Sequence, residues 1–99
     1  MAKKKDTISE TLYYQMLSAH SDNVWYVAAG LAASLKTLSV KHQVLGIAAL
    51  LLCMLHKYGL EHTEVLGIAD GMVFSGENNN IHPHFQQIVD FYMTSKEEI

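Results

Sequence analysis

Twelve consecutive uncharged and largely apolar residues, VLGIAALLLCML, lie near the middle of this chain at residues 44–55. Lysine and histidine flank the run on both sides, at residues 41–42 and 56–57. A helix that crosses a bilayer needs about 20 apolar residues, so a run of this length is typical of a core helix and not of a membrane span. We therefore expect a helix over residues 40–58 and no membrane insertion. Because this helix is apolar nearly all round, it must be enclosed by other helices or shared with another subunit.

Helical periodicity and stop signals divide the remaining chain into four more helices. The expected helices cover residues 7–19, 23–38, 61–74 and 82–96. Gly59 is placed to end the apolar helix in the left-handed conformation. The segment SGENNN at residues 75–80 carries the strongest loop signal in the chain.

No segment shows the sustained alternation of apolar and polar residues that is typical of a β-strand. We predict an all-α, compact bundle of about five helices, with a central apolar helix near residues 40–58. Ninety-nine residues suffice for one domain. We expect a flexible, basic N-terminus at residues 1–6 and a single helical domain over residues 7–99.

The string VLGIA occurs twice, at residues 44–48 and 65–69. The surrounding residues differ, which favours two helices with a similar packing problem over a repeat architecture. Glycine inside a helix is about 1 kcal/mol less favourable than alanine, and close helix packing would offset this. We expect the glycine of each copy to lie at a helix crossing, the first copy in a buried or shared helix and the second in a peripheral one. Five residues are expected to make helix-packing or oligomer contacts: Gly30, Gly46, Leu51, Leu55 and Gly67.

The charge pattern argues against a nucleic-acid partner. The net charge is −3, and all seven basic residues are lysine. Arginine is the usual residue for bidentate contacts to guanine and phosphate. A helix-turn-helix skeleton can be drawn around Gly59, but its second helix would present Glu61, Glu64 and Asp70 to the phosphates. We regard nucleic-acid binding as unlikely on these grounds.

No catalytic constellation is evident, so we expect a protein that is not an enzyme and needs no cofactor. Cys53 is the sole cysteine and lies in the apolar run, where a buried, inert thiol is expected. A single cysteine suits a reducing cytoplasm. None of the six histidines has a second metal ligand four residues away, so we predict no metal site. We expect most of them to be surface or capping residues. Two alternatives remain: a site assembled from distant histidines, or pH-dependent stability or assembly.

Aromatic and polar residues supply the candidate binding set. The cluster around NVWYV could line a ligand pocket or a protein-binding surface, since Trp and Tyr are enriched at interface hot spots. Alternatively, Trp25 anchors the core between the first two helices. The candidate binding residues are Tyr14, Trp25, Tyr26, Asn78, Asn79, Asn80, His82 and His84.

Three functional hypotheses follow. The first is a small helical protein-interaction module, a regulatory accessory protein that binds a macromolecular partner and forms a homo-oligomer, expected to be a dimer. The second is a small-molecule-binding protein with a pocket between helices or at a dimer interface. The third, disfavoured by the acidic face, is a helix-turn-helix DNA-binding regulator.

Overall fold

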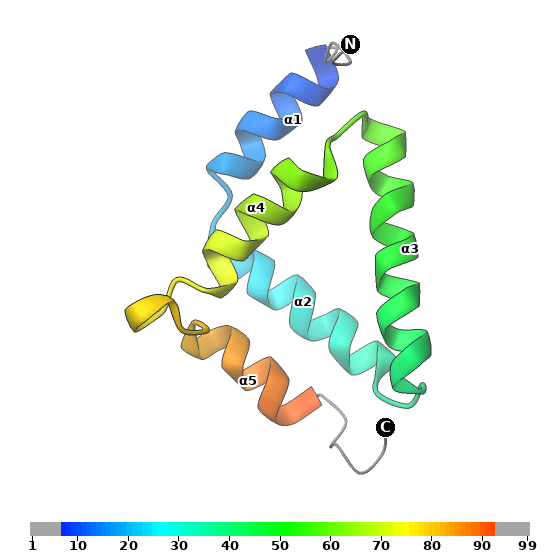
Figure 1. Ribbon diagram of the computed structural model, residues 1–99, viewed down its shortest axis with the longest axis vertical. Helices are drawn as coiled ribbons and strands as arrows, with labels where there is room; N and C mark the ends of the chain where they lie inside the picture. The colour runs from blue at the N-terminus through cyan, green and yellow to red at the C-terminus, as the bar shows by residue number, and fades with distance from the viewer. Residues whose placement is uncertain (1–6, 93–99) are drawn as a thin grey trace.

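The computed structural model describes residues 7–92, and within them the chain is an all-α bundle of five helices (Figure 1). The helices are α1 (Thr7–Leu17), α2 (Ser21–Leu35), α3 (Val40–Tyr58), α4 (His62–Val73) and α5 (Pro83–Tyr92), and the short 3₁₀ helix η1 (Glu77–Asn79) precedes α5. The predicted fold class is therefore confirmed. The N-terminal residues 1–6 and the predicted extension of the last helix to residue 96 lie outside the described residues.

Helix α3 begins and ends at the predicted residues because each end carries a local signal. Ser39 precedes the helix with an extended backbone, at φ −64° and ψ 152°, and Gly59 follows it in the left-handed conformation, at φ 67° and ψ 32°. The amides of Gly59 and Leu60 both donate to the carbonyl oxygen of Leu55. These bonds satisfy a carbonyl that the end of the helix would otherwise leave unpaired.

Helix α2 starts and ends earlier than predicted. The carbonyl of His20 accepts hydrogen bonds from the amides of Asn23 and Val24, at 3.1 and 3.3 Å, so the helix forms directly after His20. At the other end, the amide of Leu38 donates to the carbonyl of Leu35 at 2.9 Å within a turn. The chain must leave the helix there because Ser39 is extended at the start of α3.

The helices pack in two pairs, α2 with α5 and α1 with α4. Helix α3 connects α2 to α4, and the three form the sides of an open triangle (Figure 1). Among the described residues, the buried large apolar side chains are Leu55, Phe85 and Ile88. Since α5 supplies two of these three, the core of the single chain is concentrated where α5 packs on α2.

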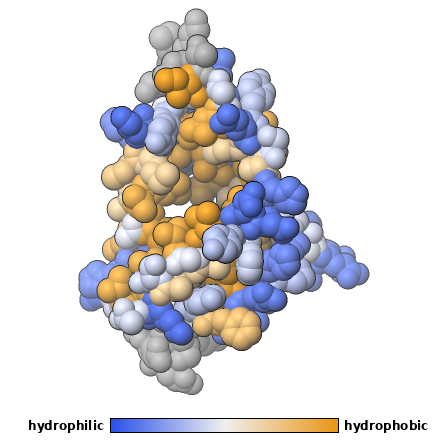
Figure 2. Space-filling view, turned by 180° about the vertical axis from the view of Figure 1, so that it is seen from behind, coloured by the Kyte–Doolittle hydropathy of each residue, from blue (hydrophilic) through white to orange (hydrophobic). Residues whose placement is uncertain are grey.

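Most of α3 is exposed in the single chain. Leu55 is its one buried residue, while Val44 is 60% exposed and Leu45 is 68% exposed. Of the two alternatives expected for the first VLGIA copy, the described residues do not enclose it, and a helix shared with another subunit stays a prediction. Figure 2 shows the hydrophobic residues gathered around a hollow in the middle of the molecule.

Helix α3 is also long enough and apolar enough to cross a membrane, with a mean hydropathy of 1.2. No other helix among the described residues meets both criteria. The uncharged stretch of α3 at residues 44–55 covers about 18 Å at 1.5 Å per residue. A bilayer core is about 30 Å thick. The uncharged stretch alone is thus shorter than the hydrocarbon region, and the absence of membrane insertion stays a prediction.

Candidate functional site

Three of the predicted binding residues meet at one corner of the molecule. The ring centroids of Trp25, on α2, and His84, on α5, are 5.3 Å apart, and those of His82 and His84 are 5.0 Å apart. Pairing α2 with α5 produces this arrangement, since Trp25 lies in the first turns of α2 and both histidines lie at the start of α5. We refer to Trp25, His82 and His84, with His20 and Asp22 described next, as the histidine corner.

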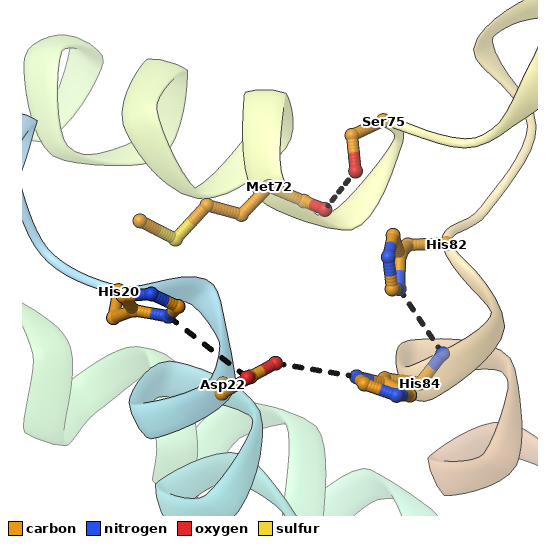
Figure 3. Close-up of polar contacts among 6 residues, drawn as sticks. All are labelled: His20, Asp22, Met72, Ser75, His82 and His84. Carbon is orange, nitrogen blue, oxygen red and sulfur yellow. Dashed lines mark hydrogen bonds and ion pairs between the residues drawn. The ribbon is translucent and has the colours of Figure 1, made fainter.

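Asp22 joins the two sides of the histidine corner, although sequence reasoning did not select it. Its Oδ1 atom lies 3.5 Å from Nδ1 of His84, and its Oδ2 atom lies 3.9 Å from Nδ1 of His20 (Figure 3). All three side chains are about half exposed or more. These contacts are ion pairs only when the histidines are protonated, and exposed pairs contribute about 1 kcal/mol or less to stability.

His82 acts as a structural residue at the histidine corner. Its Nδ1 atom accepts a hydrogen bond of 3.1 Å from the amide of His84, in the first turn of α5 (Figure 3). Its own amide donates to the carbonyl of Val73 at 2.7 Å and so ties α5 to the end of α4. A side-chain acceptor at this position satisfies an amide that the start of a helix leaves free.

Trp25 packs against α5 and not between the first two helices. It is half-buried, and its ring lies beside that of His84 at the start of α5. Its role in binding stays a prediction. Its Nε1 atom is buried and has no hydrogen-bond partner among the described residues. An unpaired buried donor is unfavourable by about 1–3 kcal/mol, so this edge of the indole is one of the less stable features of the corner.

The three asparagines of the loop serve its backbone geometry. Asn78 and Asn79 adopt positive φ angles of 59° and 62°, which asparagine tolerates better than most residues. The carbonyl of Asn80 accepts a hydrogen bond of 2.9 Å from the amide of Gly76. A Cβ atom on Gly76 would lie 2.7 Å from that same oxygen, so the turn requires glycine. All three asparagines are exposed.

The two remaining candidate residues do not join the histidine corner through any contact that the structure shows. Tyr26 is 75% exposed, and Tyr14 is 67% exposed with its ring 5.6 Å from that of Tyr13 on the same helix. The expected aromatic pocket around Trp25 and Tyr26 is therefore not formed within the described residues.

The chemical groups of the described chain are dispersed. Residues 7–92 contain no group of three or more His, Cys, Asp or Glu side chains placed to hold a metal ion. Cys53 is exposed on α3, so the prediction of a buried thiol is wrong. The thiol is exposed because the described residues bury only Leu55 of α3.

The glycines predicted at helix crossings are also open in the single chain. A Cβ atom placed on Gly30, Gly46 or Gly67 would meet nothing within 4 Å. The crossings predicted at Gly46 and Gly67 are therefore not formed among the described residues, and the role of all three glycines in an oligomer stays a prediction. Of the two leucines predicted with them, Leu55 is buried and Leu51 is half-buried.

The exposed apolar surface is the most extensive functional feature of the molecule. Eighteen large apolar or aromatic side chains are exposed among the described residues. Seven lie on α3: Val44, Leu45, Ile47, Leu50, Leu52, Met54 and Tyr58. Monomeric soluble proteins rarely expose contiguous apolar patches larger than a few hundred Å², and larger ones mark interaction sites. We therefore treat α3 and the part of α2 that faces it as the candidate interface.

An apolar groove lies between α2, α3 and α5, at one end of the candidate interface. Its volume is about 290 Å³. The residues that line it include Leu31 and Leu35 of α2, Val44 and Ile47 of α3, and Ile88 of α5. Polar groups come from Gln43 and Tyr92.

Comparison with known proteins adds no family to this description. No family model matches the chain, and no curated protein and no solved structure matches it. The geometry of the candidate interface and of the histidine corner is consequently the basis for any functional conclusion.

Proposed function

We propose that the protein is a non-enzymatic helical interaction module that works as a homo-oligomer, in the simplest case a dimer. The observation that carries the proposal is the exposure of α3, with one buried residue out of nineteen. A second copy that covers α3 would supply the burial that the single chain lacks. The assembled module would then present its polar surface, including the histidine corner, to a macromolecular partner.

The free energy that would be gained by burying the exposed side chains of α3 is large for a chain of this size. Complete burial of a Leu-sized side chain is worth about 1.5–3 kcal/mol. The six exposed aliphatic side chains of α3 retain roughly half to two thirds of their surface in water, so complete burial of all six would contribute on the order of 6–9 kcal/mol per chain. Whole domains are stable by only about 5–15 kcal/mol. Self-association is therefore a major source of stability in this proposal.

Light scattering coupled to size exclusion, from low to high micromolar concentrations, tests the proposal directly. We expect at least a dimer, with a midpoint of thermal unfolding that rises with protein concentration. Hydrogen exchange should be slow throughout α3, including the amides beside exposed side chains. A folded monomer across the whole range, with fast exchange in α3, would contradict the proposal.

Two leucine substitutions provide a matched comparison. Leu45 on α3 is 68% exposed, and Leu66 on α4, which lies outside the candidate interface, is 49% exposed. We expect Leu45→Glu to reduce the oligomer to monomers and Leu66→Glu to leave its mass unchanged. Equal effects of the two substitutions would mean that α3 has no special part in assembly.

The apolar groove favours a second candidate function, the binding of a small apolar molecule. A volume of about 290 Å³ is near the lower end of ligand pockets in proteins. The lining differs from the expected one, because α3 and α5 contribute in place of Trp25 and Tyr26. Native mass spectrometry of the purified protein tests this function. A retained molecule that Ile47→Trp displaces would support it, and an unliganded mass throughout would count against it.

A further inference from the structure

The side of α3 that faces away from its own chain carries a regular stripe. The stripe consists of His42, Leu45, Ala49, Leu52 and His56, and all five residues are exposed. On the other side of the helix, Val44 and Ile47 line the groove toward α2 and α5, and Leu55 is buried. The chain thus covers part of one side of α3 and leaves the stripe open. We call these five residues the outer stripe.

The spacing of the outer stripe is that of a helix–helix seam. Its members follow one another at alternating steps of three and four residues, which is the 3.5-residue period of a coiled coil. A straight helix repeats every 3.6 residues, so a period of 3.5 keeps one stripe in contact with a second helix crossing at about 20°. No charged residue interrupts the stripe between its two histidines.

The outer stripe also reads the same in both directions: His, Leu, Ala, Leu, His. A second α3 that runs antiparallel would place Leu45 of each copy on Leu52 of the other. Ala49 would meet its own counterpart at the two-fold axis, where a small side chain lets the helices approach. Oligomers with closed two-fold symmetry require a surface that is complementary to itself, and this stripe meets that requirement. Antiparallel helices also bring opposite ends of their dipoles together.

We propose that a second copy of this chain packs on the outer stripe, with the two α3 helices antiparallel about an axis near Ala49. The inference rests on the proposed self-association and adds the surface, the direction and the register. The spacing and the symmetry of the stripe favour a second copy over an unrelated helix, because an unrelated partner would not require the two halves of the stripe to match.

Disulfide cross-linking of reduced and then mildly oxidised protein tests the register. The chain carries Cys53→Ser, so that single cysteines can be introduced at Ala49, Leu45 or Leu52. In the antiparallel pair, opposite residues have numbers that add to about 97 or 98. Two copies of Leu45→Cys would then be offset by seven or eight residues, about 11 Å along the axis, whereas a disulfide needs Cα atoms within about 7 Å.

We expect Ala49→Cys to cross-link to itself. Leu45→Cys and Leu52→Cys should each fail alone and should cross-link when the two variants are mixed. Cross-linking of Leu45→Cys with itself would indicate parallel helices and overturn the proposal. An oligomer in which none of these cysteines cross-links would also overturn it while leaving self-association intact. A protein that is monomeric throughout would refute both the antiparallel register and the proposed self-association. Circular dichroism and light scattering of the reduced variants verify that each folds and assembles.

Discussion

Substitutions of Leu52 and Ile88 by alanine remove the same number of carbon atoms from two different surroundings. Ile88 lies in the small core between α5 and α2 and is 6% exposed, whereas Leu52 lies on the outer stripe and is 59% exposed. If α3 serves assembly and α5 serves the fold of the chain, the two substitutions should separate these contributions. Ile88→Ala should destabilise the chain itself, and Leu52→Ala should weaken mainly the oligomer.

The burial of each side chain determines how much stability or association each substitution should lose. Ile88→Ala removes a buried side chain and leaves a cavity, which destabilises by about 2–5 kcal/mol. Leu52→Ala loses the minority of its surface that the single chain buries, which amounts to less than about 1 kcal/mol. In a dimer, the exposed part of Leu52 becomes buried in both copies. Its loss then weakens association by about 3 kcal/mol, or roughly 100-fold in Kd.

Urea unfolding at two protein concentrations, combined with light scattering, measures both quantities. At the low concentration, where chains are separate, Ile88→Ala should shift the midpoint strongly and Leu52→Ala only slightly. At the high concentration, Leu52→Ala should lose most of the concentration-dependent stabilisation that we expect for the unsubstituted protein. A large effect of Leu52→Ala on the separate chain would refute the reasoning, because it would show that α3 is buried without a second copy.

Two further outcomes are expected. In Gly67→Ala the added Cβ meets nothing within 4 Å, so the substitution should stabilise α4 by about 0.5–1 kcal/mol, and an unchanged or lower Tm would contradict this. Because the ring centroids of Trp25 and His84 lie 5.3 Å apart, His84→Ala should change the fluorescence emission of Trp25, and an unchanged spectrum would argue against this contact.

The histidine corner could be foreseen only in part. The loop signal SGENNN and the two histidines that follow it indicated a polar segment, and the aromatic letters around Trp25 indicated a contact surface. No local pattern links residue 22 with residue 84, since Asp22 meets His84 only through the pairing of α2 with α5. The presence of an acidic residue in the first turn of α2 is the one signal that could have drawn attention to it.

Local chemistry in the sequence was sufficient for the existence of the five helices and for the ends of α3, but not for both ends of α2. The bounds of α3 follow from its apolar run, from Ser39 before it and from Gly59 after it, because capping and backbone conformation depend on residues within one turn. Whether α3 is enclosed could not follow from such signals. An apolar helix suits a core and an interface equally, and burial depends on which helices meet. Among residues 7–92, the pairing of α2 with α5 and of α1 with α4 leaves most of α3 without a closely packed helix.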